Sequence, residues 1–179
     1  MSPELHISLS NLQSNIQFFQ RIIKKNTELS AVVKSDAYGL GIAEIVPEIE
    51  RYGVRSFFTA TISEAIKVRR YSRDSEIFTL NGFDFLKSNL YREHNITPII
   101  NNILEAQKFI EIFNQTQKVA IQLNTGMNRL GLDKQSLLEN IDIIKSLPLN
   151  LILSHLACAD DTSNKENIQQ KDLFIKLCQ

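Results

Sequence analysis

The chain has 179 residues, which fits one domain with enough apolar material for a sizeable core. Its 20 basic and 20 acidic residues give a formal net charge of zero, so no nucleic-acid or membrane-surface partner is indicated. No apolar run reaches the roughly 18 residues of a membrane span, and the first residues lack a signal-peptide pattern. The two cysteines suit neither a metal pair nor a disulfide framework, so we expect a cytoplasmic protein.

Apolar residues recur with alternating strand and helix periods along the whole chain. Leu12, Ile16, Phe19 and Ile23 fall on one face of a helix, whereas the β-branched run ending in Val33 is typical of a strand. The pattern predicts strands over 29–34, 54–61, 76–82, 96–100, 118–124 and 149–157, and helices over 12–23, 41–53, 61–71, 84–94, 102–115, 134–147 and 165–179.

Two of the predicted helices begin with a recognisable capping signal. Thr61 and Glu64 have the spacing of a capping box, in which the two residues bond reciprocally at the helix start. Asn102 and Glu105 have the same spacing at the start of a later helix.

About six strand–helix units follow one another, which indicates a parallel sheet with helices outside it. The pattern allows an open doubly wound sheet or a barrel, and no Rossmann glycine fingerprint follows the first clear strand. A (β/α)8 barrel of the TIM type typically needs about 250 residues, so this chain would supply about six of the eight units. We predict an α/β fold with one incomplete parallel barrel domain over residues 1–179. Residues 1–9 are a candidate stray strand outside it.

Functional residues of parallel α/β proteins gather where strands end and loops begin. Lys34 ends the first predicted strand, and a lysine there is most often simply exposed to solvent. Partial desolvation by Val32 and Val33 would instead favour the neutral amine, which is the form that condenses with aldehydes. Gly39 and Gly41, just behind it, allow close backbone approach to an anion or a ring.

Three further strand ends carry polar residues, each with a plain structural alternative. Arg129 follows the fifth strand and could bind a phenolate or carboxylate, or be a surface residue of a glycine-containing turn. His155 ends the sixth strand, where a histidine is more often structural, and Asp160 and Asp161 would cap the next helix. Tyr38 could pack its ring and donate its hydroxyl to an anion. No spacing suits a metal site.

The order and composition of these segments resemble one family. AVVKSDAYGLG, LNTGMNRLG and SHLACAD, preceded by HISLSNLQSNI, closely resemble the alanine racemases, which are pyridoxal-phosphate enzymes of fold type III. The resemblance runs along the whole chain and corresponds to the N-terminal half of such an enzyme. It implies pyridoxal 5'-phosphate as the cofactor and alanine as the small-molecule substrate.

The resemblance also implies roles for four residues. Lys34 matches the lysine that forms the internal aldimine with pyridoxal phosphate and acts as the base on the D-alanine side. Tyr38 matches the tyrosine that is hydrogen-bonded to the cofactor phosphate. Arg129 matches the arginine near the cofactor's phenolic oxygen and the substrate carboxylate, and His155 matches the histidine that packs against the pyridine ring.

The chain departs from the family pattern at several points. Leu40 stands where the family often has histidine, and Asn124 replaces a common aspartate. Gln122 occupies the position of a lysine that is carboxylated in some members; its amide oxygen could accept a hydrogen bond from Arg129 instead. The family's tyrosine base, its arginine at the pyridine nitrogen, most phosphate-binding residues and its C-terminal β-domain correspond to positions beyond Gln179.

The resemblance therefore implies the activity of an alanine racemase, which interconverts L- and D-alanine by two-base proton transfer and supplies D-alanine for peptidoglycan. With one of the two bases, the chain by itself is expected to be inactive or impaired. The alternatives are a broad-specificity amino-acid racemase of the same class and a truncated, non-catalytic pyridoxal-phosphate-binding product. An incomplete barrel leaves two unpaired sheet edges, so we expect a homodimer or an edge-paired oligomer.

Overall fold

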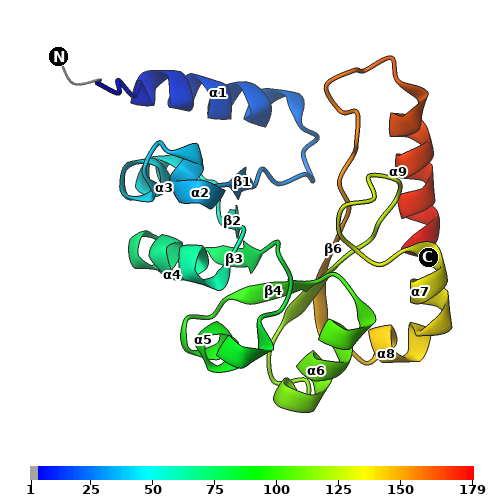
Figure 1. Cartoon of the computed structure of the whole chain (residues 1–179). Coiled ribbons are helices and arrows are strands. Elements are labelled where there is room, and N and C mark those ends of the chain that lie inside the picture. Colours follow the sequence, from blue (N-terminus) through cyan, green and yellow to red (C-terminus); the bar gives the residue numbers. More distant parts are fainter. Residues whose placement is uncertain (1–3) are drawn as a thin grey trace. The chain divides into compact units, whose positions relative to one another are not determined.

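A computed structural model describes residues 4–179, and its strands and helices alternate as predicted (Figure 1). The chain divides into two compact units. The first unit runs to Leu80 and includes His94–Ile96, and the second contains Asn81–Glu93 and Thr97–Gln179. No helix among the described residues is long and apolar enough to cross a membrane.

The first unit contains three parallel strands separated by helices. Its elements are α1 (Leu9–Ile22), β1 (Ala31–Val32), α2 (Lys34–Tyr38), α3 (Ile42–Arg51), β2 (Ser56–Thr59), α4 (Ile62–Tyr71) and β3 (Glu76–Thr79). Strand β2 is central, because Phe57 lies opposite Ala31 of β1 and opposite Ile77 of β3. Because all three strands are parallel, the carboxyl ends of β1 and β3 lie on either side of the carboxyl end of β2.

The core of the first unit is built on β2 and on the inner faces of α3 and α4. Phe57 is fully buried, and the rings of Phe58 and Phe78 stack with centroids 4.8 Å apart. Helix α1 packs on α3 but buries only Ile16, and Phe19 on its predicted apolar face is 48% exposed. The periodicity of α1 therefore predicts the helix correctly but not how deeply it is buried.

Arg69 of α4 ties the segment His94–Ile96 to the first unit. Its guanidinium donates to the carbonyl oxygens of His94 at 2.8 Å and Asn95 at 2.7 Å. It also donates to three carbonyl groups between Ser72 and Ser75. Burial lowers the pKa of Arg69, while the charges of Asp74 and Glu50 oppose that shift. The many directed donors of one arginine thus close the end of α4.

The second unit also contains three parallel strands in chain order (Figure 1). Its elements are η1 (Phe85–Lys87), α5 (Ser88–Glu93), β4 (Thr97–Ile100), α6 (Ile103–Phe113), β5 (Val119–Gln122), α7 (Lys134–Glu139), α8 (Ile141–Lys145), β6 (Leu149–Leu153) and α9 (Lys165–Leu177). Strand β5 is paired on both sides, with Ala120 opposite Ile99 of β4 and Ile121 opposite Ile152 of β6.

Aromatic rings fill much of the core of the second unit. Phe83 contacts the rings of Tyr91, Phe109 and Phe113 with centroids 5.4 to 5.6 Å apart, and Phe109 lies 4.9 Å from Phe113. All residues of β4 and β5 are buried. Strand β6 is different, because its residues are half-buried or exposed.

The structure corrects three details of the sequence interpretation. Residues 4–8 form no strand, because Ser8 caps α1 by accepting from the backbone N–H of Asn11 at 3.3 Å; residues 1–3 lie outside the described chain. The helix predicted over 134–147 is broken at Asn140, whose side chain donates to the carbonyl of Ser136 at 2.9 Å. Helix α9 is capped by Asn164 and not by the preceding aspartates.

Candidate functional site

Lys34 lies two residues past β1 and begins α2, which is one turn of left-handed helix. The next four residues, Ser35 to Tyr38, all have φ between 53° and 57°. A left-handed conformation costs roughly 1–2 kcal/mol for each residue with a side chain, because Cβ crowds the following carbonyl. The turn is therefore a strained segment that the surrounding structure must hold in place.

Backbone and side-chain hydrogen bonds hold this left-handed turn. The N–H of Ala37 donates to the carbonyl of Val33 at 3.0 Å, and the N–H of Gly41 donates to the carbonyl of Asp36 at 2.9 Å. The carboxylate of Asp36 also accepts from the N–H of Ile42 at 3.2 Å, at the start of α3. Asp36 thus closes the turn and joins it to the next helix.

The turn brings Lys34 and Tyr38 to one side of the first unit. The Nζ atom of Lys34 lies 5.8 Å from the centroid of the Tyr38 ring. Lys34 is half-buried above the fully buried Val33, whereas Tyr38 is 63% exposed. An amine and a phenol at the end of a parallel strand can together hold an aldehyde group and an anionic group of one ligand.

Arg129 lies on the loop that follows β5 in the second unit. Asn124 shapes the start of this loop, because its side-chain oxygen accepts from the N–H groups of Gly126 at 3.1 Å and Asn128 at 3.0 Å. Arg129 is exposed and makes no hydrogen bond or ion pair within residues 4–179. Its guanidinium therefore stays accessible to an anionic ligand.

Gln122 supports the same loop from below. Its side chain is buried, and Nε2 donates to the carbonyl oxygen of Leu130 at 3.4 Å. Within the described residues the predicted bond between the Gln122 amide and the Arg129 side chain is not formed. The amide holds the loop backbone beside Arg129 instead, so its contact with the guanidinium is indirect.

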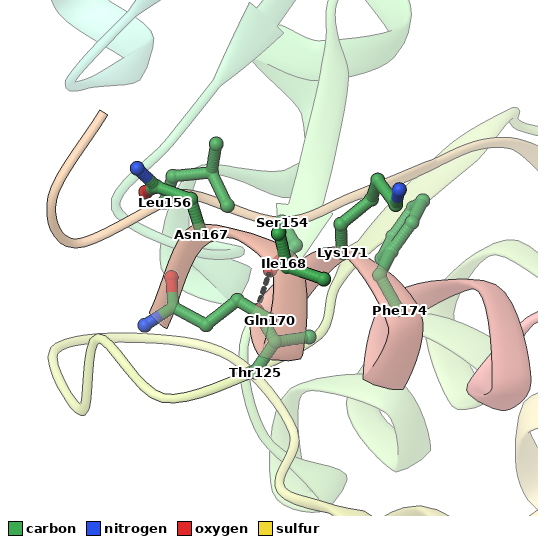
Figure 2. Close-up of a pocket in the computed structure, with 8 residues that line it drawn as sticks. All are labelled: Thr125, Ser154, Leu156, Asn167, Ile168, Gln170, Lys171 and Phe174. Carbon is green, nitrogen blue, oxygen red and sulfur yellow. Dashed lines mark hydrogen bonds between the residues drawn. The ribbon is translucent and has the colours of Figure 1, made fainter. Parts of the chain in front are cut away.

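His155 lies two residues past the end of β6, on a loop tied to the loop of Arg129. Ser154 donates to the carbonyl of Leu123 at 2.8 Å and shares a 2.8 Å hydrogen bond with Thr125 (Figure 2). His155 itself is exposed, and its Nδ1 lies 2.7 Å from the carbonyl oxygen of Leu156. The second unit thus brings together the two segments that carry Arg129 and His155.

Gln170 of α9 reinforces that connection and lines a pocket. Its side-chain oxygen accepts from the N–H of Ala157 at 3.0 Å, and the residue is 3% exposed. The pocket has a volume of about 410 Å³ and is mostly apolar (Figure 2). It is lined by Thr125, Ser154, Leu156, Asn167, Ile168, Gln170, Lys171 and Phe174. None of the four predicted cofactor residues lines it.

Two candidate residues thus lie in each unit, all on segments that follow parallel strands. Such positions define the class of α/β proteins that bind ligands at the carboxyl ends of their strands. No group of three or more His, Cys, Asp or Glu residues within the described chain is placed to hold a metal ion.

Comparisons with known proteins identify the family. A family model for the N-terminal domain of alanine racemase matches residues 7–179, so the chain belongs to the alanine racemase family. An alanine racemase of Rickettsia akari is 33% identical over 177 residues, and one of Rickettsia canadensis is 35% identical over 177 residues. Each match covers 95% of this chain and 50% of the relative. The chain therefore spans about half the length of these relatives.

Solved structures agree with this assignment. Alanine racemase of Bartonella henselae with covalently bound pyridoxal phosphate matches 96% of this chain and 52% of its own, with TM-score 0.88 and 31% identity. The biosynthetic alanine racemase of Pseudomonas aeruginosa matches 95% and 48%, with TM-score 0.83 and 29% identity. These matches confirm the predicted fold class, an α/β fold with six parallel strands that form an incomplete barrel.

Proposed function

We propose that this chain supplies the lysine-bearing part of a pyridoxal-phosphate-dependent alanine racemase, which interconverts L- and D-alanine. The carrying observation is the placement of Lys34 at the end of β1 with Tyr38 beside it, in a member of this family. The Bartonella relative with covalently bound pyridoxal phosphate supports the choice of cofactor. The D-alanine made by the whole enzyme would serve peptidoglycan synthesis.

The residues present fit this cofactor. Lys34 offers a half-buried amine for covalent attachment of the cofactor aldehyde, and Tyr38 presents an exposed phenol that can donate to the phosphate. In the second unit, Arg129 offers an unpaired guanidinium for the phenolic oxygen and the substrate carboxylate. His155 offers an exposed imidazole that can pack against the pyridine ring.

The chemistry divides between cofactor and protein. When bound, pyridoxal phosphate supplies an electron sink for the charge that develops at Cα when its proton leaves. Lys34 Nζ would hold the cofactor and move the α-proton on the D-alanine side. Arg129 would bind the substrate carboxylate through its directed donors. The chain would thus contribute one base of a two-base reaction.

Covalent attachment at Lys34 tests the proposal directly. After incubation with pyridoxal phosphate and borohydride reduction, peptide mass spectrometry should find the label mainly on Lys34. Lys34→Ala should abolish the visible absorbance of the complex, whereas Lys25→Ala, which removes an exposed lysine of the same unit, should leave it unchanged. Equal labelling of the wild type and Lys34→Ala would contradict the proposal.

Proton exchange then separates the candidate activities. In deuterated water, a chain with one working base should exchange the α-proton of D-alanine but not that of L-alanine. A non-catalytic pyridoxal-phosphate-binding product should exchange neither. Exchange of other amino acids at similar rates would favour the broad-specificity racemase.

A further inference from the structure

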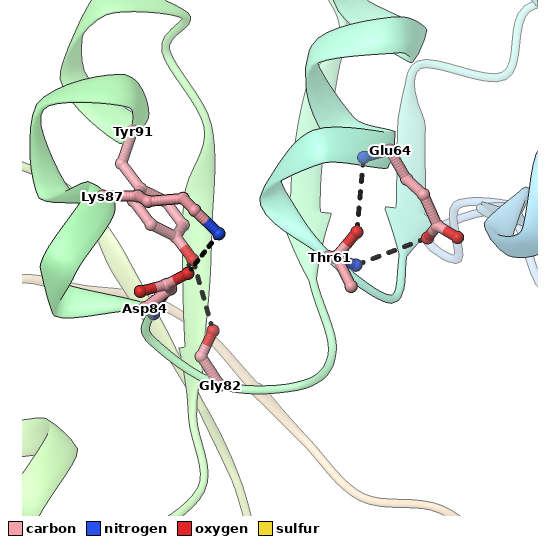
Figure 3. A network of polar contacts seen from close by, with 6 residues as sticks. All are labelled: Thr61, Glu64, Gly82, Asp84, Lys87 and Tyr91. Carbon is pink, nitrogen blue, oxygen red and sulfur yellow. Dashed lines mark hydrogen bonds and ion pairs between the residues drawn. The ribbon is translucent and has the colours of Figure 1, made fainter.

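The carboxylate of Glu64 serves two consecutive loops of the first unit. Its Oε2 accepts from the N–H groups of Ala60 at 2.8 Å and Thr61 at 3.3 Å, which completes the capping box of α4 (Figure 3). Its Oε1 accepts from the N–H of Ser35 at 2.9 Å, behind strand β1. One half-buried side chain thus joins the start of α4 to the loop that carries Lys34.

Ser35 is the residue whose position matters most for Lys34. It follows Lys34 directly and is the first of the four left-handed residues, with φ 53° and ψ 46°. A strained conformation persists only where its surroundings fix it, and the bond to Glu64 is what fixes the N–H of this residue. Hydrogen bonds from N–H groups to a carboxylate are about twice as strong as those to neutral acceptors.

The second unit contains a matching arrangement that holds no candidate residue. Glu105 of α6 accepts from the N–H groups of Asn101 at 2.9 Å and Phe83 at 3.3 Å, and Asn102 caps that helix by accepting from the N–H of Glu105. Glu105 reaches the loop around Phe83, which is held by a 3.2 Å hydrogen bond from the N–H of Asp84 to the hydroxyl of Tyr91 (Figure 3). This loop carries none of the four predicted residues. Glu105 is therefore a matched control for Glu64.

We propose that Glu64 is a positioning residue for Lys34. Its carboxylate fixes the first left-handed residue and thereby sets the direction in which the Lys34 side chain leaves the end of β1. The capping box requires of the Glu64 carboxylate only the contact to the N–H of Thr61, so the bond to Ser35 is an additional role. The consequence for reactivity rests on the proposed function of Lys34, but the effect on the turn does not.

Four variants of the full chain separate these roles. Glu64→Asp keeps a carboxylate at the helix start but is too short to serve both loops, and Glu64→Gln places an amide group against backbone donors. Glu105→Asp and Glu105→Gln make the same changes in the second unit. Circular dichroism and thermal unfolding identify the conditions under which all four are folded, and Glu64→Asp serves if Glu64→Gln does not fold.

The first measurement uses the chain without cofactor. Amide hydrogen exchange within residues 34–38 should accelerate in the Glu64 variants and stay at the wild-type rate in the Glu105 variants. The second measurement is the ratio of pyridoxal-phosphate labelling at Lys34 to labelling at exposed Lys25, after borohydride reduction. This ratio should fall in the Glu64 variants by on the order of 10- to 100-fold, the range expected when a reacting group is misplaced. Under conditions in which all four variants are folded, a small loss of global stability alone would not change this ratio.

Each result decides between the alternatives. Unchanged exchange at residues 34–38 in the Glu64 variants would overturn the inference, and so would an equal fall of the labelling ratio in the Glu105 variants. If the wild type is not labelled at Lys34, the proposed function of Lys34 fails, while the exchange measurement still decides the role of Glu64 in the turn.

Discussion

Burial of Glu105 disfavours the charged form of its carboxyl group. Desolvation raises its pKa, and the hydrogen bonds from the N–H groups of Asn101 and Phe83 and from the side chain of Asn102 oppose that shift without cancelling it. A carboxyl with a raised pKa binds its proton more tightly in the folded chain than in the unfolded one. Its contribution to stability is therefore complete below the unfolded-state pKa and is lost as pH rises through the folded-state pKa.

We predict that Glu105→Gln flattens this part of the pH dependence of stability. Urea unfolding from mildly acidic to neutral pH should show the wild type losing stability relative to the variant as pH rises. Asp133 serves as the control with opposite sign, because hydrogen bonds from Ser136 lower its pKa. The contribution of Asp133 to stability is lost as pH falls. A difference between wild type and Glu105→Gln that does not vary with pH would contradict the assignment.

At the residue scale, the sequence predicted the positions of the candidate side chains better than the conformation of the backbone that carries them. Lys34, Arg129 and His155 follow parallel strands as predicted, because apolar runs mark strand ends reliably. The left-handed run after Lys34 could not be predicted, since left-handed turns are normally signalled by glycine and none occurs between Lys34 and Tyr38. The second partner of Glu64 was equally hidden, because capping-box spacing reports only local contacts.

Helix α9 and the loop of Arg129 fit each other at one glycine. A Cβ atom built on Gly126 would lie 2.9 Å from Nε2 of the buried Gln170, and the φ of 138° is itself unfavourable for other residues. Gln170 cannot easily move away, because its oxygen accepts from the N–H of Ala157. The pairing of a glycine with a buried amide thus fixes how α9 packs on this loop.

We predict that Gly126→Ala lowers the free energy of unfolding by about 1–3 kcal/mol, the usual cost of overpacking. In a Gln170→Ala background the same substitution should cost less, because the clash is gone and only the backbone strain remains. A double-mutant cycle by urea unfolding measures the difference. Strictly additive effects would show that the two side chains do not interact.

At the element scale, periodicity predicted the existence and order of the strands and helices but not where they stop. Helix 134–147 reads as continuous because its apolar spacing continues through Asn140, yet a side-chain bond to the carbonyl of Ser136 divides it into α7 and α8. Asparagine competes with the backbone for such carbonyls, and spacing does not report this competition. Capping signals were more accurate, since both Thr61 and Asn102 begin helices as predicted.

At the scale of the whole molecule, strand β6 differs from the other strands of its unit. Among the described residues β6 pairs with β5, and none of its residues is fully buried, in contrast with β5. A strand with an open edge and half-exposed apolar side chains tends to pair with another chain. We therefore predict that edge pairing between chains occurs at β6.

We predict concentration-dependent self-association of the chain, and we expect Asn150→Lys to weaken it. Asn150 is the exposed residue of β6, so a charge there should oppose edge pairing without disturbing the core. Asn150→Thr, which adds no charge, is the control. Sedimentation velocity under reducing conditions makes the comparison. A wild-type chain that remains monomeric at all concentrations would contradict the prediction.

The left-handed turn also has a consequence for folding order. A left-handed backbone is unfavourable for residues with side chains, so we predict that the turn from Ser35 to Tyr38 forms only after α4 has brought Glu64 to Ser35 and α3 has brought Ile42 to Asp36. Before that step we expect this segment to be right-handed or extended, with a Lys34 amine that is no more reactive than those of the other lysines. The reactivity of this single amine would therefore report the completion of folding of the first unit, well after its secondary structure is in place.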